Sequence, residues 1–190
     1  MRIITGTARG CRLKTPKGQD TRPTADRVKE SLFNILGAMV SGRHVLDIFA
    51  GTGNLGLEAL SRGAASAVFV DQATSSLVRE NAIHTRLLSS AEIYGGDVFA
   101  RLSQLSAAQR SFDLIFCDPP YHKGLWQRAL RVFDTTDLLA HDGILVVEHG
   151  ADEKVLPPLS GLVCVENRRY GHTTQLSFFQ WQSYREEDDA

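Results

Sequence analysis

The chain has 190 residues, of which 43% are hydrophobic and 23% are charged, as expected for one α/β domain with a substantial core. No apolar run reaches the roughly 18 residues of a membrane-spanning helix, and early arginines interrupt any secretory signal, so we expect a cytoplasmic protein. Three scattered cysteines form neither a C-x-x-C pair nor an even set, which argues against a disulfide framework and a zinc site.

The net charge of −1 is unevenly distributed along the chain. Residues 1–44 carry a net charge of +6, and the remainder carries −7. A basic N-terminal segment suits contact with a polyanion, because Lys and Arg neutralise phosphates whatever the base sequence; a solvated tail is the alternative. We expect a basic arm over residues 1–20, one α/β domain over 21–183 and a disordered acidic tail over 184–190.

The first predicted elements are an arm and a helix. Residues 2–14 alternate turn-forming glycines with short apolar stretches, which predicts an extended arm or hairpin outside the core. Thr24 is a plausible N-cap for a helix ending near Val40. Its apolar residues recur at helical spacing: Val28, Leu32, Ile35, Leu36 and Met39.

From His44 onward, short apolar runs alternate with helical patterns, which predicts βαβ units in a mostly parallel sheet. The expected strands of this region are Val45–Phe49, Ala67–Val70, Ala91–Tyr94, Leu114–Cys117 and Ile144–Val147. Two further strands, Leu162–Arg169 and Thr173–Trp181, have no helix between them and predict an antiparallel pair at the sheet edge. The predicted fold is therefore Rossmann-like α/β, with seven strands, helices on both faces and an N-terminal hairpin arm.

The first strand leads into a glycine-rich loop, residues 47–56, that contains G-x-G-x-x-G. In such a loop Gly51 allows a sharp turn, Gly53 allows close backbone approach to a ligand, and Gly56 allows close packing of helix on strand. Asp71 ends the second strand 20 residues after Gly51, where a carboxylate suits the hydroxyls of a ribose. The loop alone does not separate nicotinamide or flavin from other adenosine ligands.

Asp47 favours one of these ligands. It is a carboxylate near the end of a strand that should be buried, and a buried acid requires a partner. S-adenosylmethionine offers a sulfonium and an α-ammonium, whereas a pyrophosphate would be repelled. The alternative is that Asp47 caps the start of the following helix.

The fourth strand ends in Asp118-Pro119-Pro120-Tyr121, the most specific motif of the sequence. The two prolines make the backbone rigid and leave acceptor carbonyls beside the carboxylate. This set suits an exocyclic amine on a nucleobase: Asp118 and the Pro119 carbonyl accept its N–H groups while Tyr121 stacks on the base. These hydrogen bonds would favour a pyramidal nitrogen whose lone pair attacks a methyl group held in line. An ordinary turn is the alternative.

Together these segments resemble the class I S-adenosylmethionine-dependent methyltransferases, and more closely the bacterial 16S ribosomal RNA guanine-N2 methyltransferases. The resemblance covers nearly the whole chain and is carried by residues 22–34, 47–63 and 118–121. It implies a class I methyltransferase fold and, as target, guanine 966 of 16S ribosomal RNA in an assembling 30S particle. The sequence departs from the family pattern at Asp71, where glutamate is common, and at Thr5-Gly6, where the family often has Gly-Gly.

The resemblance also implies site residues. S-adenosylmethionine would be the cofactor, with S-adenosylhomocysteine as product, bound by Asp47, Phe49, Gly51, Gly53, Asp71, Asp97 and Asp118. The implied catalytic residues are Asp118, Pro119, Pro120 and Tyr121. The candidate RNA contacts are Arg9, Arg12, Arg22, Arg27 and Tyr121. No metal is expected, and we expect a monomer.

Three other functions compete with this one. An adenine-N6 DNA methyltransferase would use the same Asp-Pro-Pro-Tyr chemistry, although the chain has no room for a separate DNA-recognition domain. A nicotinamide-dependent oxidoreductase would use the glycine loop, but the sequence offers no evident hydride-transfer site. A non-catalytic RNA-binding assembly factor would not require Asp47 and Asp118 to be intact.

Overall fold

The structure is a computed structural model that describes residues 1–16, 23–153 and 156–182. The candidate RNA contact Arg22 and the expected acidic tail, 184–190, lie outside the described residues. The chain divides into two compact units, Met1–Val98 and Phe99–Ala190, and each is described by itself.

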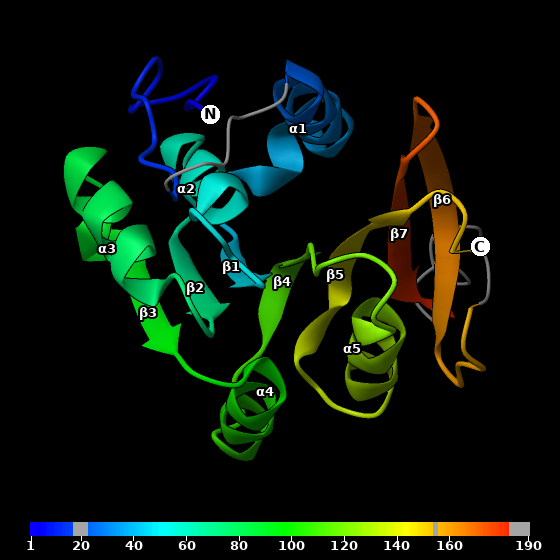
Figure 1. Cartoon of the computed structure of the whole chain (residues 1–190). Coiled ribbons are helices and arrows are strands. Elements are labelled where there is room, and N and C mark those ends of the chain that lie inside the picture. Colours follow the sequence, from blue (N-terminus) through cyan, green and yellow to red (C-terminus); the bar gives the residue numbers. More distant parts are fainter. Residues whose placement is uncertain (17–22, 154–155, 183–190) are drawn as a thin grey trace. The chain divides into compact units, whose positions relative to one another are not determined.

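A seven-stranded sheet has the order β3-β2-β1-β4-β5-β7-β6 (Figure 1). Its strands are β1 (His44–Ile48), β2 (Ser66–Asp71), β3 (Ala91–Gly95), β4 (Phe112–Cys117), β5 (Leu139–Gly150), β6 (Leu162–Tyr170) and β7 (Thr174–Trp181). In the first unit β1, β2 and β3 pair in parallel; in the second, β4 and β5 are parallel and β7 pairs antiparallel with both β5 and β6. The seven expected strands and the antiparallel C-terminal pair are confirmed.

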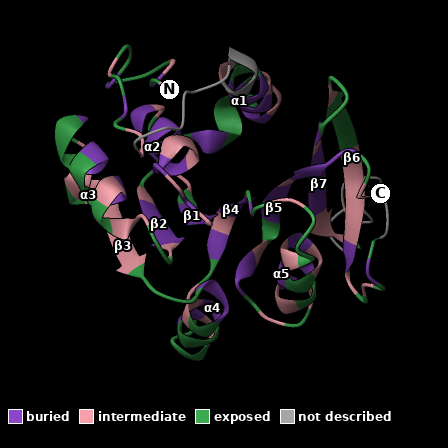
Figure 2. Cartoon of the chain, viewed as in Figure 1, coloured by how far each residue is buried: buried purple, intermediate pink, exposed green. Residues whose placement is uncertain are grey.

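The inner parallel strands are buried as their continuous apolar runs predict, whereas the edge strand β3 is only partly buried. Positions 45–48 of β1 and 67–70 of β2 are all buried, while much of β6 stays accessible (Figure 2). Asp47 is the charged residue within the buried run of β1, with 2% of its surface exposed. The sheet therefore places one carboxyl group inside an apolar layer, next to the glycine loop.

The helices alternate with the strands. They are α1 (Pro23–Leu36), α2 (Asn54–Ser61), α3 (Ser75–His84), α4 (Val98–Ala107) and α5 (Leu125–Asp134), with 3-10 turns η1 (Gly37–Val40) and η2 (Leu88–Ser90). Thr24 lies inside α1 instead of at its N-cap, because the helix begins at Pro23, a residue suited to the first turn. Met39 is 49% exposed, since the tighter winding of η1 moves it off the apolar face of α1. Among the described helices, none has the length and apolarity to cross a membrane.

The N-terminal arm, residues 1–16, folds back on itself as expected. The backbones of Arg2 and Arg12 pair in an isolated antiparallel β-bridge, and the amide of Ile3 donates to the carbonyl of Cys11 at 2.9 Å. The expectation that the arm stays outside the core is wrong, because Ile3, Ala8 and Leu13 are buried.

The arm is attached to α2 at Ser61. The Ser61 hydroxyl donates to the carbonyl of Thr5 at 2.6 Å and accepts the amide of Ala8 at 2.9 Å. Gly6 has φ +85°, and a Cβ on it would lie 1.7 Å from the Ser61 carbonyl oxygen. The arm thus approaches α2 so closely that only glycine fits at this position.

Candidate active site

The glycine loop turns sharply out of β1, as predicted. Gly51 has φ +57° and Gly53 has φ +78°, both in the left-handed region that glycine enters without steric cost. The amide of Gly53 donates to the carbonyl of Ala50 at 2.7 Å and closes the turn. Phe49 has φ +59°, a conformation that is costly for a residue with a side chain and that is concentrated at ligand sites.

Gly56 and Asp47 fix the start of α2 against the sheet. A Cβ on Gly56 would lie 2.3 Å from the ring of Phe69 on β2, so the expected close packing of helix on strand is confirmed. The Asp47 carboxylate accepts the amide of Gly56 at 2.8 Å, which is the helix-capping contact considered above. Burial raises the pKa of Asp47 to about 8, although the hydrogen bond from Gly56 opposes this, and the charge of Asp71 adds to it. The carboxyl group is therefore mostly protonated at neutral pH, and a nearby cation would favour its ionised form.

Asp71, at the end of β2, ties the glycine loop to the start of α3. It accepts the amide of Gly51 on one oxygen (3.0 Å) and the amides of Ala73 and Thr74 on the other (both 2.8 Å). Burial alone would raise the pKa of Asp71, but these hydrogen bonds outweigh burial and lower it. The side chain of Thr74 also contributes to the lowered pKa of Asp71, so the carboxylate is held ionised at the end of β2.

Asp97 lies just beyond β3. Asp71 and Gly95 are register partners on neighbouring strands, and Asp97 follows two residues later, exposed and directly before α4. The ends of β1, β2 and β3 therefore provide Asp47, Asp71 and Asp97, and the segments that follow them, 49–56, 72–74 and 96–97, contain no Lys or Arg. These groups fit a cationic ligand with hydroxyl and amino groups, such as S-adenosylmethionine, better than a pyrophosphate.

The Asp-Pro-Pro-Tyr loop follows β4 in the second unit. Asp118 and Pro120 are exposed, Pro119 is buried and Tyr121 is half-buried. Over the described ranges, neither proline carbonyl accepts a hydrogen bond. The loop therefore presents free acceptor oxygens next to a carboxylate, as the sequence predicted.

Tyr121 is fixed at its hydroxyl end. The hydroxyl donates to Oε1 of Glu148 on β5 at 2.7 Å and lies 3.2 Å from Oγ1 of Thr174 on β7. Burial and the adjacent Glu148 carboxylate raise the pKa of Tyr121, so the phenol stays neutral. The sequence analysis missed Glu148, although an acid directly after the apolar run of residues 144–147 signals a buried polar partner.

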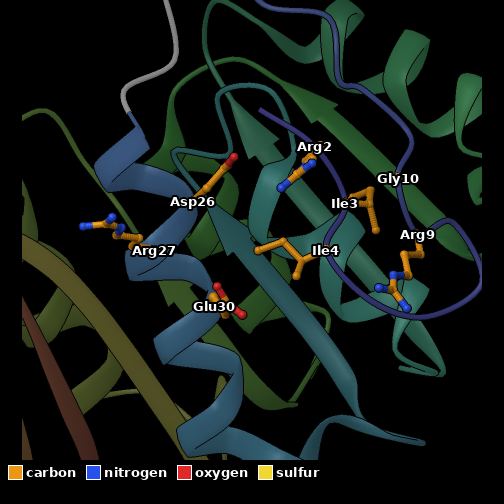
Figure 3. A pocket seen from close by; sticks show the side chains of 8 residues that line it. All are labelled: Arg2, Ile3, Ile4, Arg9, Gly10, Asp26, Arg27 and Glu30. Atoms are coloured by element: carbon orange, nitrogen blue, oxygen red, sulfur yellow. The ribbon is translucent and has the colours of Figure 1, made fainter.

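The candidate RNA contacts in the first unit lie on the arm and on α1. Arg9, Arg12 and Arg27 are exposed. A cavity of about 500 Å³ lies between the arm and α1, lined by Arg2, Ile3, Ile4, Arg9, Gly10, Asp26, Arg27 and Glu30 (Figure 3). Figure 3 shows Arg2 and Arg9 on the arm and Asp26 and Glu30 on α1, so the cavity has a basic and an acidic wall, and the side chain of Arg27 is directed away from Asp26 and Glu30. The sequence analysis did not single out Arg2, Asp26 or Glu30 as site residues.

The cysteines and histidines form no further site in the described part of the chain. All three cysteines are free: Cys117 is buried, and Cys11 and Cys164 are partly buried. Within residues 1–16, 23–153 and 156–182, no three His, Cys, Asp or Glu side chains gather in a way that could hold a metal ion.

Comparison with known sequences gives a consistent picture. A family model described as Conserved hypothetical protein 95 matches residues 1–180. The chain is similar to YlbH of Bacillus subtilis, with 37% identity over 175 residues, covering 91% of this chain and 95% of that protein. It is also similar to the Ribosomal RNA small subunit methyltransferase D of Escherichia coli K12, with 36% identity over 150 residues, covering 78% of this chain and 74% of that protein.

Comparison with solved structures agrees. The structure of yhhF from Escherichia coli superposes with a TM-score of 0.83 and 32% identity, covering 95% of this chain and 97% of that chain. SMU.776 complexed with SAH superposes with a TM-score of 0.68, covering 84% of this chain and 50% of that chain. Its identity is 15%, so this likeness shows the fold alone.

Proposed function

The chain belongs to the Conserved hypothetical protein 95 family, and from this premise we propose that it transfers a methyl group to the exocyclic N2 of a guanine in 16S ribosomal RNA. It is an S-adenosylmethionine-dependent methyltransferase. The observation that carries an exocyclic base amine as the acceptor is the Asp-Pro-Pro-Tyr loop, with its free carbonyls, exposed carboxylate and anchored ring, whereas the choice of a guanine in 16S ribosomal RNA rests on the family. The name of the Escherichia coli relative supports ribosomal RNA as the substrate class.

The first unit supplies the proposed cofactor residues. When bound, S-adenosylmethionine supplies an electrophilic methyl group on its sulfonium. Asp47 would ionise beside the cofactor's ammonium group, and the ionised Asp71 would accept a ribose hydroxyl. The proposed set is Asp47, Phe49, Gly51, Gly53, Asp71, Asp97 and, from the second unit, Asp118.

The second unit supplies the proposed catalytic residues Asp118, Pro119, Pro120 and Tyr121. Asp118 and the Pro119 carbonyl accept the two N–H groups of the guanine amine, while the ring of Tyr121 stacks on the base. With the cofactor bound, the nitrogen held by these acceptors would take the methyl group that the sulfonium supplies, and S-adenosylhomocysteine would be released. The extra proton on nitrogen passes to Asp118 or to water, because a methylated cationic amine is a strong acid.

The basic arm supplies the proposed RNA contacts. Arg9 and Arg12 are exposed on the arm, Arg27 is exposed on α1, and Arg22 completes the set from outside the described residues. These side chains neutralise phosphates and therefore act on any RNA of suitable shape. We further propose that the substrate is an assembling 30S particle in the cytoplasm, and that the protein acts as a monomer.

Replacing one carboxylate tests the proposed chemistry. The variant Asp118→Asn keeps the shape of the loop but weakens acceptance of the amine protons, so the single-turnover rate of methyl transfer to 16S ribosomal RNA should fall at least about 100-fold. Asp137→Asn, an exposed position after α5, is the matched control and should keep the parental rate. A parental rate in Asp118→Asn would contradict the assigned role.

A further inference from the structure

Two buried polar side chains connect the N-terminal arm with the glycine loop. They are Lys29 on α1 and Asn81 on α3, which have 2% and 0% of their surfaces exposed. Both belong to the first unit, as do the arm and the loop. Neither residue belongs to the proposed cofactor or catalytic set.

Lys29 contacts three separate segments of the unit. Its ammonium donates to the Arg2 carbonyl of the arm at 2.6 Å, to Oδ1 of Asn54 at 2.7 Å and to the Glu58 carboxylate at 3.0 Å. An ammonium has three protons, so its donor capacity is fully used. Because Asn54 is the first residue of α2 and directly follows Gly53, Lys29 fixes one end of the glycine loop to the arm.

The Glu58 carboxylate that pairs with Lys29 is also saturated. It accepts Nε of Arg62 at 2.8 Å and the arm amides of Ile4 at 2.7 Å and Thr5 at 3.0 Å. These three donors and the Lys29 ammonium make four, and they fill the four acceptor positions of the carboxylate. The ion pair is buried and fully hydrogen-bonded, so it holds one defined position of the arm.

Asn81 makes the second connection, on the other side of Gly53. Its Oδ1 accepts the amide of Lys14 at 2.8 Å, and its Nδ2 donates to the Lys14 carbonyl at 3.0 Å. The same Nδ2 donates to the carbonyl of Thr52 at 2.9 Å. The two ends of the arm are therefore hydrogen-bonded, through one side chain each, to the residues that flank Gly53.

We propose that Lys29 and Asn81 are positioning residues that couple RNA on the arm to the cofactor at the glycine loop. The arm side chains of Arg2 and Arg9 line the cavity in Figure 3, while the Arg2 carbonyl accepts Lys29. RNA that holds the arm in this position also holds Thr52 and Asn54 of the glycine loop. A cofactor that holds the glycine loop in turn also holds the arm. Since such coupling is reciprocal, each ligand raises the affinity of the other by the same factor.

This inference rests on the proposed function, and RNA binding tests it. The dissociation constant of an in vitro transcript of 16S ribosomal RNA is measured by filter binding, without and with saturating S-adenosylhomocysteine, whose own binding is measured by calorimetry. In the parental protein, S-adenosylhomocysteine should tighten RNA binding about 5-fold or more. The measured quantity is the ratio of the dissociation constants without and with S-adenosylhomocysteine. In Asn81→Ala and in Lys29→Met this ratio should fall close to one.

Ser61→Ala is the matched control, because the Ser61 hydroxyl holds the arm at Thr5 and Ala8 from the C-terminal end of α2, whereas the glycine loop precedes the first residue of that helix. It should keep the parental ratio although it loosens the arm. Circular dichroism establishes which variants fold. If Lys29→Met does not fold, because it leaves Glu58 with a buried charge, Asn81→Ala and the parental ratio still decide the question.

Two results would overturn the coupling: a ratio of one in the parental protein while S-adenosylhomocysteine binds, or an unchanged ratio in Asn81→Ala. Failure of the parental protein to bind S-adenosylhomocysteine would instead overturn the proposed function, and this inference with it. The calorimetric measurement therefore separates the two failures.

Discussion

At the scale of single residues, the protonation of Asp47 has a measurable consequence. Its pKa is about 8 in the folded protein, against an ordinary value of 3.8 for the unfolded chain. Between these values the folded state holds a proton that the unfolded state has lost, so the contribution of Asp47 to stability is greatest below about pH 4 and is lost as pH rises toward and through 8.

The variant Asp47→Asn should remove this pH dependence. It keeps an acceptor for the Gly56 amide but cannot ionise. We expect its free energy of unfolding to fall less between pH 5 and pH 8 than that of the parental protein, and the variant to be the more stable protein at pH 8. Urea unfolding at both pH values measures this. If the free energy of unfolding falls equally in the two proteins between pH 5 and pH 8, Asp47 is not protonated in the folded state.

The anchoring of Tyr121 gives a second prediction at this scale. Glu148→Ala removes the acceptor of the phenol, so the ring loses its fixed orientation and kcat should fall about 10-fold. Glu148→Gln retains an acceptor oxygen and should recover most of the rate. The affinity for S-adenosylhomocysteine should be the same in both variants. If Glu148→Gln loses as much rate as Glu148→Ala, the charge of Glu148 matters instead of its hydrogen bond.

At the scale of elements, the docking of the arm on α2 depends on one glycine. Gly6 and Gly10 have nearly equal backbone angles, φ +85° and +84°, but a Cβ on Gly10 would meet nothing within 4 Å. Gly10→Ala should therefore cost only backbone strain, about 1 kcal/mol, whereas Gly6→Ala also forces the arm away from Ser61 and should cost at least about 2 kcal/mol more. Urea unfolding compares them. If Gly6→Ala and Gly10→Ala lose the same free energy of unfolding, the arm does not pack on α2 in solution.

The elements also show what local sequence can reveal. Strands such as β1 and β2 were predictable because burial on both faces produces continuous apolar runs. The docking of the arm was not, because its partners Glu58 and Ser61 lie more than 50 residues away. Lys29 did carry a signal, since it shares a helical face with Leu32 and Phe33 and a cation there requires a partner.

The candidate site also has features that local sequence predicts and features that only the fold reveals. The turn at Gly51 and the free carbonyls of the Asp-Pro-Pro-Tyr loop were predictable, because proline and glycine restrict the backbone locally. The bond between Tyr121 and Glu148 joins two elements and is visible only in the fold. Asn81 gave no signal, because a polar residue in a helix is ordinary until its burial is known.

At the scale of the whole molecule, the uneven charge of the chain predicts how RNA binding responds to salt. The net charge is +6 over residues 1–44 and −7 over the rest, so the arm and α1 should provide most phosphate contacts. Arg9→Ala should reduce the slope of log K against log salt concentration by about 0.7, the value for one phosphate contact on a single strand. Arg131→Ala, exposed on α5, is the control and should leave the slope unchanged. Equal slopes for Arg9→Ala and the parental protein would remove Arg9 from the interface.

The most direct test of the whole account is the identity of the methylated nucleoside. The protein is incubated with labelled S-adenosylmethionine and, separately, with unmethylated 30S particles, naked 16S ribosomal RNA and duplex DNA, and the products are digested and identified by mass spectrometry. The account predicts N2-methylguanosine at one site in ribosomal RNA, with more product from the assembled particle. N6-methyladenine in DNA, or no methylated nucleoside from any acceptor despite bound cofactor, would contradict it.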